Sequence, residues 1–208
     1  MSARSAGKCA IIARFSALVQ RITMAIELIL GGARSGKSRL AEQRAQAHGG
    51  PVTVVATAEA GDAEMAARIA RHRADRPRHW RTIEAPTALA ATLADTCRAD
   101  ACVIVDCLTL WLSNLLTADA GALCSPHDAT ALTRWQAERE ALLSALPTLP
   151  GAVILVANEV GLGLVPESPL GRLFRDEAGR LNQAIAAASG RVTFVAAGLP
   201  LTLKPAPG

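Results

Sequence analysis

A glycine-rich octapeptide constrains this chain more than any other stretch: Gly31-Gly32-Ala33-Arg34-Ser35-Gly36-Lys37-Ser38. It fits the pattern Gly-x-x-x-x-Gly-Lys-Ser, and it lies between the apolar run Ile26–Leu30 and a helical pattern that begins near Lys37. Glycines in such a turn let several backbone N–H groups converge on the oxygens of one phosphate. Lys37 would then reach the β- and γ-phosphates, and the Ser38 hydroxyl would hold Mg²⁺. The sequence therefore predicts a P-loop that binds a nucleoside triphosphate.

Short apolar runs alternate with longer helical patterns along the chain. We expect strands at Ile26–Leu30, Val52–Ala56, Arg81–Glu84, Ala101–Asp106, Ala152–Ala157 and Arg191–Ala196. We expect helices at Lys37–Ala47, Ala63–Arg73, Thr87–Arg98, Leu108–Thr117, Ala129–Ala145 and Leu170–Ala188. Apolar strands that alternate with helices indicate an α/β fold, a mostly parallel sheet with helices on both faces. Ligands of such folds bind at the carboxyl ends of the strands, where the motifs of this chain fall.

The length of 208 residues, half of them hydrophobic, suits a single domain, which we place at residues 24–200. Residues 118–128 have the composition of a surface loop. Residues 201–208 carry two prolines, and we expect a frayed, flexible tail there. No apolar run approaches the roughly 20 residues that a helix needs to cross a bilayer.

The basic excess of the chain is confined to its first residues. Four of the 22 basic residues lie in residues 1–23, which contain no acid, so the remainder has 18 basic and 18 acidic residues. A neutral body with 3% aromatic residues offers little to nucleic acid, which we do not expect as a partner. Residues 1–23 are either an amphipathic targeting peptide or an upstream extension with a misassigned start, and we favour the extension. The five cysteines form no CxxC pair, which is typical of a reducing cytoplasm.

Two further segments carry charged or nucleophilic groups. Asp106 ends an apolar strand, where a P-loop protein places its second Mg²⁺-positioning group. The segment from Ala67 to Trp80 gathers five arginines and two histidines around one helix end. These arginines are either a solvated helix end that complements the dipole or ligands for phosphate oxygens. His72 is accordingly a bystander or an attacking imidazole.

The stretch Asn158–Glu167 leaves a strand with polar groups and continues with two glycines. It is equally compatible with a substrate-binding or closing loop and with an ordinary strand-to-helix connection.

Taken together, these motifs resemble the bifunctional adenosylcobinamide kinase / adenosylcobinamide-phosphate guanylyltransferase family of cobalamin biosynthesis. The resemblance covers Ile26 to about Ala197, and the order of the P-loop, the Arg76-Pro77-Arg78-His79-Trp80 stretch and the Asn158-Glu159-Val160-Gly161 stretch is its most specific part. The other matching stretches are Asp62–Ile69, His72, Arg81-Thr82, Val165-Pro166-Glu167, Phe174-Arg175-Asp176 and Gly179–Gln183.

The resemblance implies two reactions. ATP or GTP donates its γ-phosphoryl group to the aminopropanol hydroxyl of adenosylcobinamide. A histidine then attacks the α-phosphorus of GTP, and the cobinamide phosphate takes the guanylyl group from it to give adenosylcobinamide-GDP. The matching histidine is His72. The family often has a second histidine just before it, where this chain has Arg71.

The resemblance also implies the residues that contact GTP and the metal. They are Gly31, Gly32, Ala33, Arg34, Ser35, Gly36, Lys37, Ser38, Ala56, Thr57, Ala58, Arg73, Ala74, Asp75, Arg76, Glu84 and Asp106. Thr57 and Glu84 would hydrogen-bond a guanine or ribose edge, and Ser38 and Asp106 would hold Mg²⁺. Asp106 replaces the glutamate of some relatives, a change of one methylene. The family is RecA-like in fold and forms a homotrimer with sites near the subunit boundaries.

Two other functions remain open. The chain could be a monofunctional P-loop kinase of a small metabolite, without guanylyl transfer. It could also be a non-enzymatic, nucleotide-dependent switch that signals through the Asn158–Glu167 loop.

Overall fold

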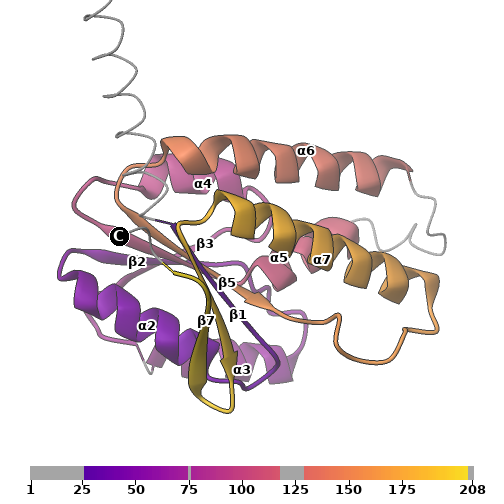
Figure 1. Cartoon of the computed structure of the whole chain (residues 1–208), viewed down its shortest axis with the longest axis horizontal. Coiled ribbons are helices and arrows are strands. Elements are labelled where there is room, and N and C mark those ends of the chain that lie inside the picture. The colour runs from indigo at the N-terminus through magenta and orange to yellow at the C-terminus, as the bar shows by residue number, and fades with distance from the viewer. Residues whose placement is uncertain (1–25, 75, 118–128, 206–208) are drawn as a thin grey trace, which may run out of the picture.

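Seven strands form one sheet in the order β3-β2-β4-β5-β1-β6-β7 (Figure 1). The computed structural model describes residues 26–74, 76–117 and 129–205. The strands are β1 (Ile26–Gly31), β2 (Val52–Ala56), β3 (Arg81–Glu84), β4 (Cys102–Asp106), β5 (Ala152–Asn158), β6 (Arg191–Ala196) and β7 (Leu199–Lys204). The first six are parallel, and β7 runs antiparallel to β6 at the edge. The predicted α/β fold with a mostly parallel sheet is confirmed, and the P-loop sequence lies between β1 and α2.

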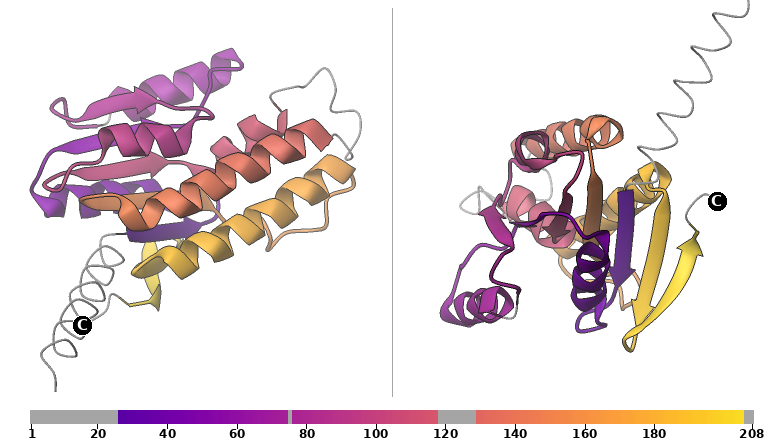
Figure 2. Two further views of the ribbon diagram at one scale, coloured as in Figure 1. Left: turned by 90° about the horizontal axis from the view of Figure 1, so that it is seen from above. Right: turned by 90° about the vertical axis from the view of Figure 1, so that its left-hand side faces the viewer.

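Helices cover both faces of the sheet (Figures 1 and 2). The helices are α2 (Lys37–His48), α3 (Ala63–Ala74), α4 (Leu89–Thr96), α5 (Leu108–Thr117), α6 (Ala129–Ala145), the short 3₁₀ helix η1 (Leu146–Thr148) and α7 (Pro169–Ala188). Alternation along each strand divides the core, because successive side chains point to opposite faces. In β1, Leu28 and Leu30 join the cluster under α4–α7, whereas Ile29 joins the cluster under α2.

The core under α4–α7 is built around two tryptophans. Trp111 of α5 and Trp135 of α6 are fully buried, and their rings meet edge to face with centroids 5.3 Å apart. Each indole N–H has a partner: Trp111 donates to the carbonyl of Thr87 at 2.7 Å, and Trp135 donates to the carboxylate of Glu177 at 2.8 Å. The two rings and their hydrogen bonds thus join α5 and α6 within this core.

Helix α3 is attached differently. It stands apart from the sheet in Figure 2, and none of its described side chains is fully buried. Its amino-terminal end is capped by Asp62, whose carboxylate accepts the amide of Met65 at 2.7 Å. The helix therefore lies over one end of the sheet rather than against a face of it.

The expected elements agree with the structure within about two residues at their ends. The largest difference is α4, which spans Leu89–Thr96 where the sequence predicts Thr87–Arg98. Its last turn stops because Cys97 has an extended backbone, with φ −64° and ψ 136°. Such fraying at helix ends is normal and changes nothing in the topology.

The expectation of a frayed tail from residue 201 is wrong for residues 201–204. Leu199–Lys204 form β7, which pairs with β6. The ammonium of Lys204 donates to the carbonyls of Ala186, Ala187 and Ser189 at 3.2, 3.4 and 2.5 Å, and so fastens the strand to the end of α7. The two prolines of the expected tail, Pro205 and Pro207, follow the strand in the sequence. Pro200 lies within β7 and is tolerated because this strand is at the edge of the sheet.

Other expectations fall on residues outside the described ranges. The proposed extension 1–23 and the proposed loop 118–128 are among them, as are residues 206–208 of the tail. Within the described part of the chain, no helix is both long and apolar enough to span a membrane.

Candidate active site

The P-loop follows β1 and is tightly packed at its start. A Cβ atom on Gly31 would lie 2.5 Å from the Ser35 hydroxyl oxygen and 2.5 Å from the carbonyl oxygen of Val195. Only glycine fits such a position. The loop is also held by the β6–β7 turn, because the amide of Gly198 donates to the carbonyl of Ser35 at 2.8 Å.

The P-loop leads into the amino-terminal end of α2, whose first backbone amides are not capped by a side chain. Gly36 has a left-handed φ of 98° and immediately precedes the helix, and no side chain caps the first-turn amides. No acidic residue lies in this turn, whereas Lys37 and Ser38 are its first two residues. Uncapped amides, the positive end of a helix dipole and a lysine together favour an anion such as a phosphate.

One pocket opens from this helix end, and we call it the P-loop pocket. Eight residues expected in the site line it: Lys37, Ser38, Ala56, Ala58, His72, Arg73, Arg76 and Asp106. They come from α2, the ends of β2 and β4, and the last turn of α3 with the residues that follow it. The carboxyl ends of the parallel strands thus meet at the P-loop, as the sequence predicts.

His72 lines the pocket from α3. Met65 and Ile69 of the same helix also line the pocket. The three residues are spaced i, i+4 and i+7, and so share one face of the helix. The apolar stripe of α3 therefore faces the pocket and not the core, and it brings His72 to the P-loop from a distant part of the sequence.

Arg76 pairs with Asp106, so the two residues do not act independently. The guanidinium Nη2 donates to Asp106 Oδ2 at 2.9 Å, and Nε lies 3.8 Å from a carboxylate oxygen of Glu42 on α2. The Arg76 side chain is only 7% exposed. The sequence suggested a phosphate ligand at Arg76 and a metal position at Asp106, but it gave no sign of this ion pair or of Glu42.

The expected hydrogen bond from Thr57 to a base or ribose is wrong. Thr57 is fully buried, and its hydroxyl donates to the carbonyl of Cys107 at 2.7 Å and accepts the amide of Cys107 at 2.9 Å. Its own amide donates to the carbonyl of Asp106, and its carbonyl accepts the side-chain amide of Asn114 at 2.7 Å. Every polar group of Thr57 is hydrogen-bonded inside the protein, because the connection between β4 and α5 covers the end of β2.

Glu84 lies beside the P-loop pocket but does not line it. Its carboxylate accepts from Arg73 Nη2 at 2.6 Å, and both side chains are largely exposed. They border a neighbouring hollow together with Ala58. Ala74 ends α3 and lines neither the pocket nor this hollow among the described residues, and Asp75 lies outside the described ranges.

Several pocket residues were not in the predicted set. Besides Met65 and Ile69 these are Cys107, Leu110 and Asn158. The helical spacing to His72 could have identified Met65 and Ile69. Asn158 ends β5 at the start of the stretch considered as a substrate loop, and its position next to the P-loop favours that interpretation. Cys107 and Leu110 carry no comparable signal.

Cys107 is the second nucleophilic group at this pocket. Burial raises the pKa of its thiol above the usual value, and the charge of Asp106 raises the pKa further. A thiol with a raised pKa stays protonated at neutral pH and is a poor nucleophile. His72 is therefore the better candidate for attack on phosphorus.

The oxygen donors of the pocket fit Mg²⁺. Ser38 contributes a hydroxyl and Asp106 a carboxylate, both hard oxygen ligands of the kind that Mg²⁺ prefers. The described residues contain no cluster of three or more His, Cys, Asp or Glu side chains that could hold a metal by themselves. A metal here would complete its shell with phosphate oxygens and water, as is usual for Mg²⁺ in nucleotide sites.

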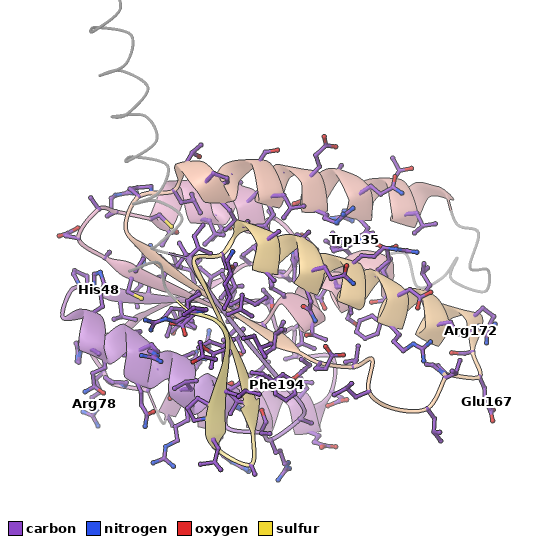
Figure 3. The ribbon with its side chains drawn as sticks, in the orientation of Figure 1. His48, Arg78, Trp135, Glu167, Arg172 and Phe194 are labelled. Carbon is purple, nitrogen blue, oxygen red and sulfur yellow. The ribbon has the colours of Figure 1, made fainter. Side chains whose placement is uncertain are left out.

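The loop after β5 is fastened at both ends. The amide of Glu159 donates to the carbonyl of Gly31 at 3.0 Å, which ties the loop to the P-loop. At the other end, Arg172 of α7 donates to the carbonyls of Pro166 and Glu167, and Figure 3 shows Arg172 beside Glu167. Between these anchors the side chains of Leu162, Leu164 and Val165 are 83%, 96% and 63% exposed.

Comparisons with known proteins extend these findings. The bifunctional adenosylcobalamin biosynthesis protein CobP of Pseudomonas aeruginosa is 58% identical over 181 residues, which cover 87% of this chain and 98% of that protein. Proteins named CobU, with the same description, from Escherichia coli and Salmonella typhimurium are each 42% identical over 180 residues, 85% of this chain and 98% of theirs. The solved structure of the flagellar accessory protein FlaH from Methanocaldococcus jannaschii has a TM-score of 0.45 and 15% identity, and covers 88% of this chain and 80% of that one.

A family model described as cobinamide kinase / cobinamide phosphate guanyltransferase matches residues 27–203. This range includes every described strand except the ends of β1 and β7, and all described helices. The match over most of the chain, together with relatives of this identity and coverage, shows that the chain belongs to the cobinamide kinase / cobinamide phosphate guanyltransferase family.

Proposed function

We propose that this protein phosphorylates adenosylcobinamide and then attaches GMP to the product, with His72 as the covalent carrier of the guanylyl group. The observation that carries the proposal is the shared pocket of His72 and the P-loop residues Lys37 and Ser38. A P-loop alone accounts for the kinase step. An imidazole facing the same pocket accounts for a second, nucleotidyl-transfer step.

In the kinase step, the acceptor hydroxyl of the cobinamide attacks the γ-phosphorus. The new P–O bond forms as the bond to the β-phosphate oxygen breaks, the nucleoside diphosphate leaves, and the hydroxyl proton passes to solvent. Lys37 and the uncapped amides of α2 stabilise the negative charge on the phosphate oxygens. Ser38 and Asp106 would hold Mg²⁺, which would supply positive charge to offset that of the phosphates.

In the guanylyl-transfer step, a ring nitrogen of His72 attacks the α-phosphorus of GTP and pyrophosphate leaves. A phosphate oxygen of cobinamide phosphate then attacks the same phosphorus, and the N–P bond breaks. Splitting the transfer into two displacements is the usual gain of covalent catalysis. Arg73, which also lines the pocket, supplies positive charge close to His72.

We assign GTP as the guanylyl donor, and ATP or GTP as the phosphoryl donor. The nucleotide would lie against the backbone of Gly31–Ser38 and against Ala56 and Ala58 at the end of β2. The second substrate is a small corrinoid. We further propose a cytoplasmic location, which is supported by the thiols of Cys97, Cys102 and Cys107, all buried and unpaired.

We also propose a homotrimer. The support is a set of large apolar side chains that the single chain leaves exposed: Leu162, Leu164, Val165, Leu199, Leu201 and Leu203. The last three occupy every second position of the edge strand β7, so they lie on one side of it. In a monomer these apolar side chains would face water. Light scattering on the purified protein would test the stoichiometry, and a monomer at micromolar concentration would contradict it.

Incubation with GTP labelled at the α-phosphate tests the proposed function. We expect label on the wild-type protein that is stable to alkali and labile to acid, its absence from His72→Ala, and its release by cobinamide phosphate. A monofunctional kinase would phosphorylate cobinamide without becoming labelled. A nucleotide-dependent switch would hydrolyse nucleotide slowly with no effect of either corrinoid.

A further inference from the structure

A buried guanidinium lies between two carboxylates beneath the P-loop pocket. Arg76 follows α3, whereas Glu42 belongs to α2 and Asp106 ends β4. The Arg76 side chain is 7% exposed, Asp106 22% and Glu42 31%. Carboxylates from α2 and β4 thus meet the guanidinium that follows α3, and we call this group the Glu42–Arg76–Asp106 cluster.

Among the described residues, Arg76 is also the first after His72 whose side chain is largely buried. No described side chain of α3 is fully buried, and the other ion pair at this end of the helix, between Arg73 and Glu84, is largely exposed. An exposed pair of this kind contributes little to holding a helix in place. After Arg76, the chain is fixed again by Trp80, which is 9% exposed and packs in the core under α2. The position of the last turn of α3 therefore depends mainly on Arg76.

The contacts of Arg76 indicate that it links parts of the protein and is not free to bind a phosphate. Nη2 is hydrogen-bonded to Asp106, and the buried Nε has no hydrogen-bond partner but points to Glu42 at 3.8 Å. A guanidinium that left this place for a phosphate would give up its hydrogen bond to Asp106 and its ion pair with Glu42, which is costly for a side chain that is 7% exposed.

We infer that Glu42 and Arg76 are positioning residues, which together with Asp106 fix His72 over the P-loop for attack on the α-phosphorus. The inference rests on the proposed function. Asp106, a proposed Mg²⁺ holder, accepts a hydrogen bond from Arg76 through Oδ2. The same carboxylate is thus connected to the end of α3, which carries His72. Glu42 supplies a second negative charge, which would help to hold Arg76 if Asp106 also held Mg²⁺.

If the cluster positions His72, its loss should affect the two reactions differently. Attack by His72 requires the ring nitrogen close to phosphorus and in line with the leaving group, whereas phosphorylation of cobinamide does not use His72. Misplacement of a reacting group by about 1 Å can slow a reaction roughly 100-fold without loss of substrate binding. Loss of the cluster should therefore slow guanylylation far more than it weakens GTP binding or slows the kinase reaction.

The experiment compares Glu42→Gln and Arg76→Met with two exposed controls, Glu140→Gln on α6 and Arg71→Met on α3. Three quantities are measured on each full-length protein: the single-turnover rate of His72 labelling at saturating GTP, the GTP dissociation constant, and the rate of cobinamide phosphorylation. We expect labelling to fall about 10- to 100-fold in Arg76→Met and several-fold in Glu42→Gln. In Glu42→Gln, GTP affinity and phosphorylation should stay within about threefold of the wild type. In Arg76→Met both should fall much less than the labelling does, and Arg76→Lys should restore part of the labelling.

Three results would overturn the inference. Labelling of Glu42→Gln at the wild-type rate would remove Glu42 from the cluster. A loss of GTP affinity in Arg76→Met as large as its loss of labelling would make Arg76 a phosphate ligand. Equal losses in both reactions would indicate general damage, and if Arg76→Met does not fold, Glu42→Gln and Arg76→Lys decide. A wild-type protein that takes no label despite binding GTP would instead refute the proposed function itself.

Discussion

Thr57 and Cys107 bind each other twice: the Thr57 hydroxyl donates to the Cys107 carbonyl at 2.7 Å and accepts the Cys107 amide at 2.9 Å. These two bonds join the end of β2 to the turn between β4 and α5. They fix the backbone beside Asp106, one of the proposed metal positions. Thr57 thus shapes the pocket from inside the protein, without facing its ligand.

Replacing Thr57 by valine should destabilise the fold, because the shape is kept while the buried amide of Cys107 loses its partner and the carbonyl of Cys107 keeps only the amide of Trp111. We expect the free energy of unfolding to fall by about 2–4 kcal/mol, measured by urea denaturation. Thr57→Ser keeps the hydroxyl and should recover most of the loss. Equal stability of the valine and wild-type proteins would show that the two bonds contribute nothing net.

Gly31 and Gly32 offer a matched comparison within the P-loop. A Cβ on Gly31 would collide with the Ser35 hydroxyl and the Val195 carbonyl, whereas a Cβ on Gly32 meets nothing within 4 Å. Gly31→Ala should therefore lower the stability by about 1–3 kcal/mol and weaken nucleotide binding. Gly32→Ala should leave the melting temperature nearly unchanged. Similar melting temperatures for both variants would contradict the packing seen at Gly31.

Lys204 holds the edge strand that the sequence did not predict. Lys204→Met removes the ammonium that donates to the carbonyls at the end of α7. We expect amide hydrogen exchange in β7 to become faster, with a loss of about 1–2 kcal/mol in local stability. Exchange in β4 should not change, and it serves as the internal control. Unchanged exchange in β7 would mean that pairing with β6 alone holds the strand.

Two buried thiols should make the stability depend on alkaline pH. Burial raises the pKa of Cys97 to about 11 and that of Cys102 to about 12, from a usual value of 9.0. The unfolded chain loses these protons first, so stability is retained below pH 9 and falls as the pH rises toward the folded values. Cys102→Ala should have a shallower decline between pH 9 and 11 than the wild type. Parallel declines would rule out a contribution from this thiol.

The strands and helices were largely predictable because their signals are local. β1, β4 and β5 are short apolar runs, and the P-loop motif marks the junction of β1 with α2. β7 was missed because what stabilises it is not local: its partner β6 and the Lys204 contacts to α7. That omission matters for the site, since the β6–β7 turn holds the P-loop through Gly198 and Ser35.

The sequence predicted which residues form the candidate site better than it predicted the contacts between them. The family resemblance brought His72, Lys37, Ser38 and Asp106 to one place, and the structure puts all four at one pocket. It could not show that Asp106 is shared with Arg76, or that Thr57 is enclosed. Such pairings depend on how separate elements pack, and neither propensity nor motif spacing encodes them.

The central claim is that the imidazole of His72 captures GMP from a nucleotide bound at the P-loop. Mass spectrometry of the protein after incubation with GTP and Mg²⁺, followed by peptide mapping under alkaline conditions, tests it most directly. The account predicts one added guanylyl group per chain, located on His72, absent from His72→Ala and unaffected in His48→Ala. A guanylyl group on another residue, or none on a protein that demonstrably binds GTP, would contradict the account.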